Sequence, residues 1–412
     1  MSAVIGLKCI ACGKEYPVEG MQYVCAQCGG NLDVVYDYDR ISRSLTRESL
    51  RADGDFSVWR YWDLLPLDDR TRRMPLQIGW TPLYRAGRLA DRLGMKRLYL
   101  KDDGRNPSAS FKDRASSVAV CKALEFGFET IAGASTGNAA SSTACLCASL
   151  GISPTIFVPK AAPKAKIAQL LVFGARVFAV EGTYDDAFDL CTQVCAEYGW
   201  YNRNTGFNPY TREGKKTVSY EICEQLDWEV PDVVLVPVGD GNIISGVWKG
   251  FRDLLGAGLI ERAPRIIAVQ SGKSSAIVDA VLSGAEVSPV SATTIADSIS
   301  VDLPRDGLAA VQAVSESGGT GIMVSDEAIL AAIVTLARGS GVFAEPAGAT
   351  AWAGLEALIE AGTVSRDESV VFLVTGNGLK DVASAMKVAG EPTPMAPSLE
   401  AFQAYLKEEK QG

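Results

Sequence analysis

Short runs of apolar residues alternate along most of the chain with longer stretches in which apolar residues recur every three or four positions. The short runs predict strands and the periodic stretches predict helices. The predicted strands cover residues 97–101, 130–134, 154–158, 176–180, 232–238, 265–270 and 369–375. The predicted helices cover residues 115–126, 139–149, 163–173, 185–198, 214–226, 243–255, 326–338 and 347–361. Because continuous apolar strands alternate with helices, we expect an α/β fold with a mostly parallel sheet.

The two ends of the chain do not follow this alternation. Residues 1–36 contain four cysteines, and residues 37–80 carry charges and aromatic residues without a clean period. We expect a small cysteine-rich unit followed by a connecting arm. The tail, residues 391–412, is rich in proline and charge, which predicts an exposed extension.

Length and charge narrow the possible functions. The chain has 412 residues, of which 47% are hydrophobic, as expected for two or three globular domains with sizeable cores. A net charge of −9 argues against general nucleic-acid binding. No apolar run reaches the roughly 18 residues of a membrane span, and the N-terminus lacks the layout of a signal peptide. We therefore expect a cytoplasmic protein. Its acidic balance does not exclude a phosphorylated small substrate, because local lysines and helix N-termini can hold an anion.

The sequence contains no histidine. Ser-His-Asp and Cys-His catalysis, histidine-ligated metals and histidine general bases are therefore excluded. Acid–base chemistry must fall to Lys, Asp, Glu, Tyr or a bound cofactor.

Two C-x-x-C-G motifs lie near the N-terminus, and their cysteines are Cys9, Cys12, Cys25 and Cys28. Four thiolates at this spacing are typical of a closed tetrahedral zinc site, which would be structural because it leaves no open coordination position. Disulfides or free thiols are the alternative, and a cytoplasmic location disfavours disulfides. The other cysteines lie in apolar helical patterns and are expected to be buried: Cys121, Cys145, Cys147, Cys191, Cys195 and Cys223.

The stretch Asn106-Pro-Ser-Ala-Ser-Phe-Lys112-Asp-Arg114 places one lysine between a predicted strand and a predicted helix. A lysine in such a turn can be shielded from water, and desolvation lowers its pKa and makes it a useful nucleophile. A surface lysine on a first helical turn is the simpler alternative for this stretch taken alone.

Two other loops follow predicted strands, at the edge where parallel sheets bind ligands. The first contains Ser135, Thr136 and Asn138, and the free amides of the following helical turn can hold a carboxylate. The second begins with Thr375, whose hydroxyl can reach a ligand atom from the end of its strand. Each loop alone could equally be a capped helix or a strand-end turn.

A glycine-rich loop between residues 232–238 and 243–255 is a candidate phosphate site. Its glycines let backbone N–H groups approach a phosphate, and the helix N-terminus favours negative charge. It lacks the spacing of a Walker loop or a dinucleotide-binding fingerprint. The candidate residues are Gly239, Asp240, Gly241, Asn242 and Ile243. Because a carboxylate would repel a phosphate, we expect Asp240 to point away or to cap the turn.

Together the lysine stretch and the three loops contain the residue types that bind pyridoxal 5'-phosphate. Lys112 would form the Schiff base, and the glycine-rich loop would bind the phosphate. Asn138 would meet the ring hydroxyl, and Thr375 the ring nitrogen.

As an ordered set, these segments resemble the pyridoxal-phosphate enzymes of the tryptophan-synthase β-subunit type and, within them, the threonine synthases. The lysine stretch is similar to the family's lysine motif, and Ser135-Thr-Gly-Asn138 to its asparagine loop. Further similar segments are residues 208–209, 213–217, 343–347 and 375–381. A zinc-ribbon-like N-terminal segment also occurs in members of that family.

The resemblance implies two α/β domains with the cofactor between them. A smaller, mobile domain over residues 118–206 would carry the asparagine loop, and a larger one over residues 81–117 and 207–390 would carry Lys112, the phosphate loop and Thr375. The implied reaction converts O-phospho-L-homoserine and water to L-threonine and phosphate. In it the lysine shuttles protons, phosphate leaves from the γ carbon and water adds at the β carbon. A homodimer is the family's habit.

The substrate contacts implied by the resemblance are Ser135, Thr136, Asn208 and Arg212. The family carries an arginine where this chain has Thr211, so Arg212, one place later, is the candidate for the substrate's phosphate, with Lys215 and Lys216 as helpers. This displacement leaves open β-replacement on O-phosphoserine, as in cysteate synthase, or dehydration of threonine or serine. A catalytically silent binding protein whose ribbon docks a partner is the alternative from another class.

Overall fold

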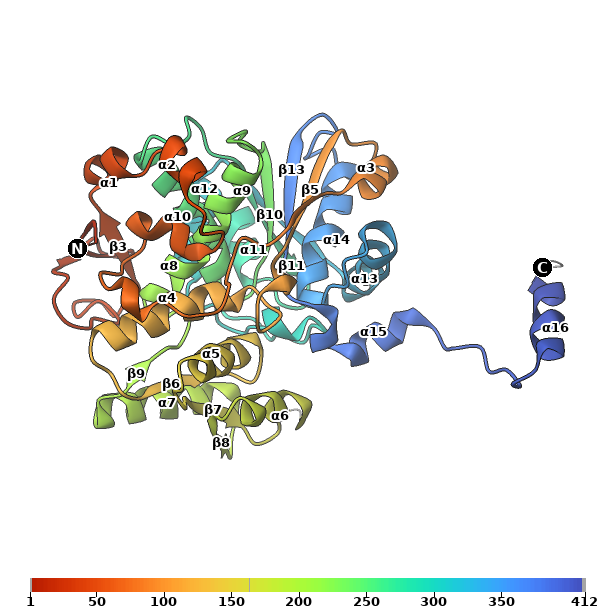
Figure 1. Cartoon of the computed structure of the whole chain (residues 1–412), viewed down its shortest axis with the longest axis horizontal. Coiled ribbons are helices and arrows are strands. Elements are labelled where there is room, and N and C mark those ends of the chain that lie inside the picture. Colours follow the sequence, from red (N-terminus) through yellow and green to blue (C-terminus); the bar gives the residue numbers. More distant parts are fainter. Residues whose placement is uncertain (1, 163, 410–412) are drawn as a thin grey trace.

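Three β-sheets organise this computed structural model, which describes residues 2–162 and 164–409 (Figure 1). The first sheet has the order β2 (Glu15–Tyr16), β1 (Val4–Cys9), β3 (Leu32–Tyr36). The second has the order β12 (Thr320–Val324), β11 (Arg265–Ser271), β10 (Val233–Pro237), β13 (Ser369–Val374), β5 (Arg97–Asp102), β4 (Leu83–Arg85). The third has the order β8 (Arg176–Val180), β7 (Thr155–Pro159), β6 (Ile131–Ala134), β9 (Tyr201–Asn202).

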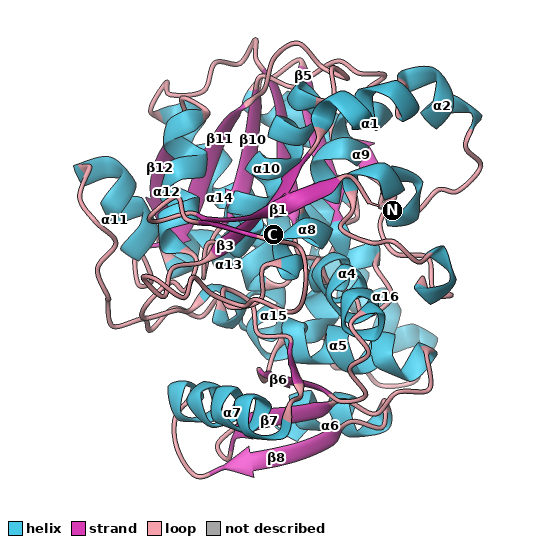
Figure 2. Cartoon of the chain, turned by 90° about the vertical axis from the view of Figure 1, so that its left-hand side faces the viewer, coloured by secondary structure: helices cyan, strands magenta, loops and turns pink. Residues whose placement is uncertain are grey.

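Helices flank the two larger sheets, and Figure 2 shows the four-stranded sheet as a separate unit below the six-stranded one. The four-stranded sheet is accompanied by α5 (Asn138–Ser149), α6 (Lys164–Val172) and α7 (Tyr184–Tyr198). The helices of the larger unit are α3 (Gly87–Leu93), α8 (Tyr210–Lys215), α9 (Thr217–Gln225), α10 (Asn242–Gly256), α11 (Ala276–Ser283), α12 (Gly307–Glu316), α13 (Asp326–Ser340) and α14 (Pro346–Glu360). Helix α4 (Lys112–Glu125) contacts both units, through α8 and α5.

The remaining helices belong to the two ends of the chain. Helices α1 (Tyr38–Ser44) and α2 (Arg47–Ala52) and the 3-10 helix Val58–Leu64 lie in the predicted arm, which is more ordered than its irregular sequence pattern predicted. Trp59 and Tyr61 are buried there, which explains the aromatic residues of the arm. Helices α15 (Val382–Ala389) and α16 (Leu399–Glu409) end the chain, and α16 lies apart from the main body (Figure 1).

The predicted α/β class is confirmed. Each of the seven predicted strands is present, and all pairings in the two larger sheets are parallel except β4 with β5. The predicted helix over residues 214–226 corresponds to α9 and to the last two residues of α8. Strands β4, β9 and β12 of the two larger sheets and helices α3, α11 and α12 were not predicted. In the described part of the chain, none of the helices has both the length and the apolar composition needed to cross a bilayer.

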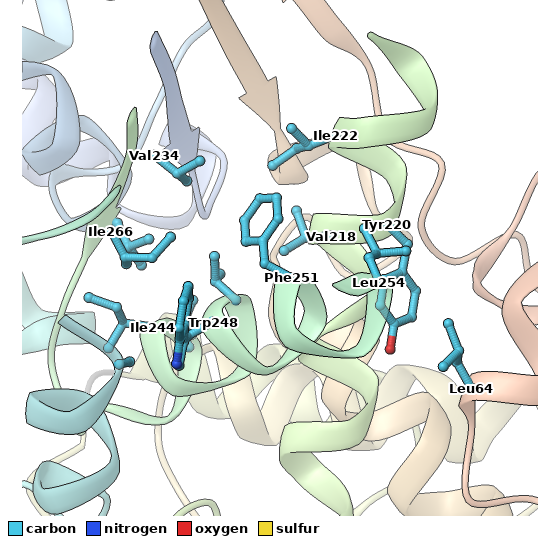
Figure 3. Packing of buried hydrophobic residues seen from close by; sticks show 14 of the residues in the cluster. Leu64, Val218, Tyr220, Ile222, Val234, Ile244, Trp248, Phe251, Leu254 and Ile266 are labelled. Carbon is cyan, nitrogen blue, oxygen red and sulfur yellow. The ribbon is translucent and has the colours of Figure 1, made fainter. Parts of the chain in front are cut away.

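The core of the larger unit forms around α10, one face of which packs on the six-stranded sheet. Phe251 of α10 lies beside Val218 of α9, Trp248 lies beside Ile244 on α10 itself, and Ile266 of β11 packs in the same cluster (Figure 3). All five residues of β10 are buried, as the continuous apolar run predicts for a central parallel strand. This packing fixes the N-terminus of α10, and therefore the glycine-rich loop before it.

The predicted ligand loops all follow the carboxyl ends of parallel strands. Lys112 follows β5, the glycine-rich loop follows β10, and Thr375 follows β13. Asn138 follows β6 of the other sheet. Because carboxyl ends of parallel strands form the binding edge of α/β sheets, the topology brings these loops together.

Candidate active site

Lys112 is the first residue of α4, and the turn that precedes it is held by backbone hydrogen bonds from the end of β13. Phe111 N donates to Thr375 O at 2.9 Å, and Asn377 N donates to Ala109 O at 3.1 Å. Ala109 has a φ of 63°, a left-handed conformation that costs a non-glycine residue about 1 kcal/mol or more. The surrounding structure therefore imposes the shape of this turn.

The arginine of the lysine stretch anchors α4. Arg114 is fully buried and donates to Asp103 Oδ2 at 2.6 Å and to Glu221 Oε2 at 2.7 Å. Breaking a buried pair of this kind costs about 3–5 kcal/mol. On the same turn, Asp113 accepts hydrogen bonds from the N–H of Ser108 at 2.6 Å and from its hydroxyl at 2.5 Å. These two residues hold the lysine in place and do not face a ligand.

The amine of Lys112 has no hydrogen bond or ion pair within residues 2–162 and 164–409. Burial lowers its pKa, Asp240 offsets part of this effect, and Arg203 lowers the pKa further. A lysine with a lowered pKa is more often neutral near pH 7 and is then nucleophilic. The sequence-based expectation for Lys112 thus has a physical basis in the structure.

A small cavity opens beside Lys112. The predicted cofactor residues that line it are Lys112, Asn138, Gly239, Asp240, Gly241, Ile243 and Thr375. Asn242 does not, because its side chain turns away: Nδ2 donates to Asp306 Oδ2 at 2.8 Å, and Oδ1 accepts from Lys215 at 2.5 Å. The structure therefore brings all but one of these side chains and glycines to one cavity.

The cavity suits a phosphorylated aromatic ring. Gly241 has a φ of 89° and precedes α10, so the N-terminus of this helix faces the cavity. Asp240 Oδ1 accepts from Asn242 N at 3.1 Å and so caps the turn, as expected. Phe111 and Ile299 provide apolar walls on which a flat ring could lie.

Asn138 Nδ2 donates to Glu345 Oε1 at 2.7 Å. Burial raises the pKa of Glu345 to about 7, although Lys380 and Asn138 oppose the shift. Glu345 precedes α14 and lines the cavity, and we did not predict it as a site residue. Its position within residues 343–347, one of the segments named above, was the available signal.

A larger cleft adjoins the cavity, and the two share Lys112, Asn138, Asp240 and Ser298. Ser135 and Thr136 line this cleft, where the resemblance implied substrate contacts. The cleft runs between residues that follow the four-stranded sheet and residues 292–305 of the larger unit. A ligand in the cleft would thus lie beside both Lys112 and Asp240 of the glycine-rich loop.

Asn208 and Arg212, the other two predicted substrate contacts, line neither the cavity nor the cleft. Asn208 is buried and donates to Asn202 O at 2.8 Å. Arg212 donates to both oxygens of Asp306, at 2.6 and 2.8 Å, and to Asp33 at 3.1 Å. The expectation that Arg212 faces a substrate is therefore corrected, because two carboxylates occupy its guanidinium.

The thiols of Cys9, Cys12, Cys25 and Cys28 lie within 4.8 Å of one another. The Sγ–Sγ distances are 3.5 Å for Cys9–Cys28 and 3.6 Å for Cys12–Cys25, too long for disulfides. Zn–S bonds of about 2.3 Å in a tetrahedron place sulfurs at similar separations. The donor set fits one zinc ion.

Comparison with known proteins assigns the family. The model of the family described as "Pyridoxal-phosphate dependent enzyme" matches residues 74–376. The chain belongs to this family. The matched range includes Lys112 and all the other residues that line the cavity.

Curated relatives of this pyridoxal-phosphate dependent enzyme include two threonine synthases. That of Methanocaldococcus jannaschii is 40% identical over 404 residues, 97% of this chain and 99% of the relative. That of Methanosarcina acetivorans is 41% identical over 403 residues, 97% and 98% of the two chains. Among solved structures, threonine deaminase isoform 2 from Solanum lycopersicum, in its processed form, has a TM-score of 0.66 at 22% identity. The likeness covers 90% of this chain and 98% of the other, and it shows a shared fold.

Proposed function

We propose that this chain is a threonine synthase, which converts O-phospho-L-homoserine and water to L-threonine and phosphate. The observation that carries the proposal is the place of Lys112, where a cavity that suits the cofactor meets a larger cleft. The threonine synthases that match almost the whole chain at 40 and 41% identity support the same substrate.

The residues of the cavity would hold pyridoxal phosphate in four ways. Lys112 would attach it covalently, and the backbone amides of residues 239–243 at the start of α10 would bind its phosphate. Asn138 would contact the ring hydroxyl and Thr375 the ring nitrogen. When bound, the cofactor supplies an electron sink for the charge that remains on a substrate carbon after proton removal.

Proton transfer would be carried out by side chains of the protein and not by the cofactor. Lys112 Nζ would carry protons at the α, β and γ carbons of the substrate, and burial lowers its pKa, which favours the neutral amine that can accept them. The absence of histidine leaves this amine as the principal base. The Ser135–Asn138 turn at the N-terminus of α5 would bind the α-carboxylate. A hydrogen bond within the turn stabilises its shape, because Ser135 Oγ accepts from Gly137 N at 3.2 Å.

We also propose that Cys9, Cys12, Cys25 and Cys28 bind a structural zinc ion, since their thiols converge without an open coordination position. The division into a mobile small domain, residues 118–206, and a large domain, residues 81–117 and 207–390, belongs to the same proposal. The separate sheets of the two units support it.

The proposal is tested by offering the purified holoenzyme three substrates and measuring every product. O-phospho-L-homoserine should give threonine and phosphate in equal amounts. O-phospho-L-serine should release little phosphate, and L-threonine should give little keto acid. Clear turnover of either of these with none of phosphohomoserine would move the assignment to β-replacement or dehydration. A protein without near-visible absorbance from a lysine-bound cofactor would indicate a silent binding protein.

A further inference from the structure

Most buried cations of the larger unit are neutralised by carboxylates. The ion-paired residues are Lys101, Arg114, Arg212, Lys216 and Lys249. Arg203 is different: its side chain forms no ion pair with any residue in the described ranges 2–162 and 164–409. It is 3% exposed, and its hydrogen bonds go to two hydroxyls, Ser116 Oγ at 2.9 Å and Thr205 Oγ1 at 2.9 Å. An unpaired buried cation is costly and needs a reason.

The position of Arg203 supplies a reason. It follows β9 and lines the cleft together with Lys112. Its partner Ser116 lies one helical turn beyond Lys112 on α4, so the guanidinium sits close to the reactive amine. Burial lowers the pKa of Arg203 to about 10, and Asp240 offsets part of the shift. At neutral pH the group therefore remains a cation.

The neighbouring residue, Asn204, is buried and lines the same cleft. Its Oδ1 accepts from Ala134 N at 2.7 Å, and its side chain also interacts with the thiol of Cys191, which does not line the cleft. The Arg203 guanidinium is therefore the charged donor on this wall of the cleft, and a charged donor without a carboxylate partner is the chemistry of an anion site.

Other cations near the cleft are less suitable. Arg305 lines it but donates to Asp185 at 2.8 Å and lies over the Phe188 ring at 4.7 Å. Lys215 also lacks a carboxylate partner, but it bonds to Asn242 and lines neither the cavity nor the cleft.

We infer that Arg203 binds the phosphate group of the substrate and so selects phosphorylated amino acids. This inference rests on the proposed function, and it replaces the role that the sequence pattern suggested for Arg212. A phosphate monoester carries close to two negative charges at pH 7, and a guanidinium can donate to two of its oxygens at once. The cofactor's phosphate and the substrate's α-carboxylate have separate amide sites at the N-termini of α10 and α5.

The test compares Arg203→Met and Arg203→Lys with Arg176→Met, a matched change of an arginine that also donates to a hydroxyl, Thr155 Oγ1 at 2.8 Å, but lines neither the cavity nor the cleft. For each holoenzyme, kcat/KM for O-phospho-L-homoserine is measured, with dissociation constants for inorganic phosphate, L-threonine and pyridoxal phosphate. Losing a hydrogen bond to a charged group lowers affinity by roughly ten- to a hundred-fold. We therefore expect Arg203→Met to lower kcat/KM and phosphate affinity at least that much. Arg203→Lys should restore part of both, and Arg176→Met should change neither.

The affinities for L-threonine and for pyridoxal phosphate show which anionic group Arg203 binds: the substrate's phosphate, the α-carboxylate or the cofactor's phosphate. Threonine and pyridoxal phosphate should bind the Arg203 variants within about threefold of the unchanged enzyme. An equal loss of threonine affinity would assign Arg203 to the α-carboxylate, and a loss of cofactor affinity would assign it to the cofactor. Either result would overturn the inference. An unchanged kcat/KM for O-phospho-L-homoserine would overturn it as well. If the unchanged enzyme does not turn over phosphohomoserine, the proposed function fails, while the inorganic-phosphate arm still decides whether Arg203 binds phosphate.

Discussion

Arg212 donates one hydrogen bond to each carboxylate oxygen of Asp306, at 2.6 and 2.8 Å. Asp306 also accepts from Asn242 Nδ2 at 2.8 Å, at the start of α10. The same guanidinium donates to Asp33 on β3 of the cysteine-rich unit at 3.1 Å. Arg212 therefore ties this N-terminal unit to the helix that follows the glycine-rich loop.

Because Arg212 is an internal tie, Arg212→Met should act on stability and not on substrate choice. Removing one partner of a buried ion pair costs about 3–5 kcal/mol. We expect a clear fall in melting temperature, while the ratio of phosphate to threonine affinity stays as in the unchanged enzyme. A selective loss of phosphate affinity at unchanged melting temperature would restore Arg212 as a substrate ligand.

The four converging thiols predict about one zinc ion per chain. Removing it with a chelator should lower the melting temperature, because these thiols lie in the unit that Asp33 ties to the body. The near-visible absorbance should persist, since the cofactor cavity is lined by other elements. Metal analysis and absorbance check both statements. Protein prepared under reducing conditions that still contained disulfides and no metal would refute them.

Lys112→Ala should abolish turnover and the absorbance of the covalently attached cofactor, yet leave the protein folded. Its side chain has no polar partner in the described structure, so its removal breaks no internal bond. The matched control is Lys122→Ala on the same helix, where Lys122 pairs with Glu125 at 3.0 Å, and this variant should keep its absorbance. Circular dichroism verifies folding, and an active Lys112→Ala enzyme would exclude the assignment.

The raised pKa of Glu345 predicts that the free energy of unfolding of the cofactor-free protein depends on pH. Its folded-state pKa is about 7, raised from 4.5 mainly by burial, so the folded state holds a proton that the unfolded state releases. This contribution to stability is complete below about pH 4.5 and is lost as pH rises towards 7, with a total of the order of 3 kcal/mol. Denaturant unfolding across this range should show that slope, and Glu345→Gln should flatten it. An equal slope in both proteins would contradict the prediction.

The alternating strands and helices of the two α/β units were largely predictable from the sequence, because buried parallel strands such as β10 are continuous apolar runs. The sequence pattern missed β12, in which Thr320, Ile322 and Met323 are not buried. It also missed the region of β9, whose two residues are too few to form a recognisable run.

The same distinction applies to the candidate-site residues, because some follow strands that the sequence predicts and Arg203 does not. Lys112, Asn138 and Thr375 follow strands that the sequence reveals, and the structure brings them to one cavity. Arg203 follows the unrecognised β9, and its polar run with Asn204 and Thr205 was the available signal. Spacing along the chain could not separate it from Arg212, because only packing shows which arginine already has carboxylate partners.

The most direct test of threonine synthesis is the reaction of O-phospho-L-homoserine in water labelled with heavy oxygen, followed by mass spectrometry of both products. If phosphate leaves with its bridging oxygen and water adds at the β carbon, the label appears in the hydroxyl of threonine and is absent from phosphate. Label in the phosphate, with homoserine as the other product, would show hydrolysis of the ester and would contradict the proposed function.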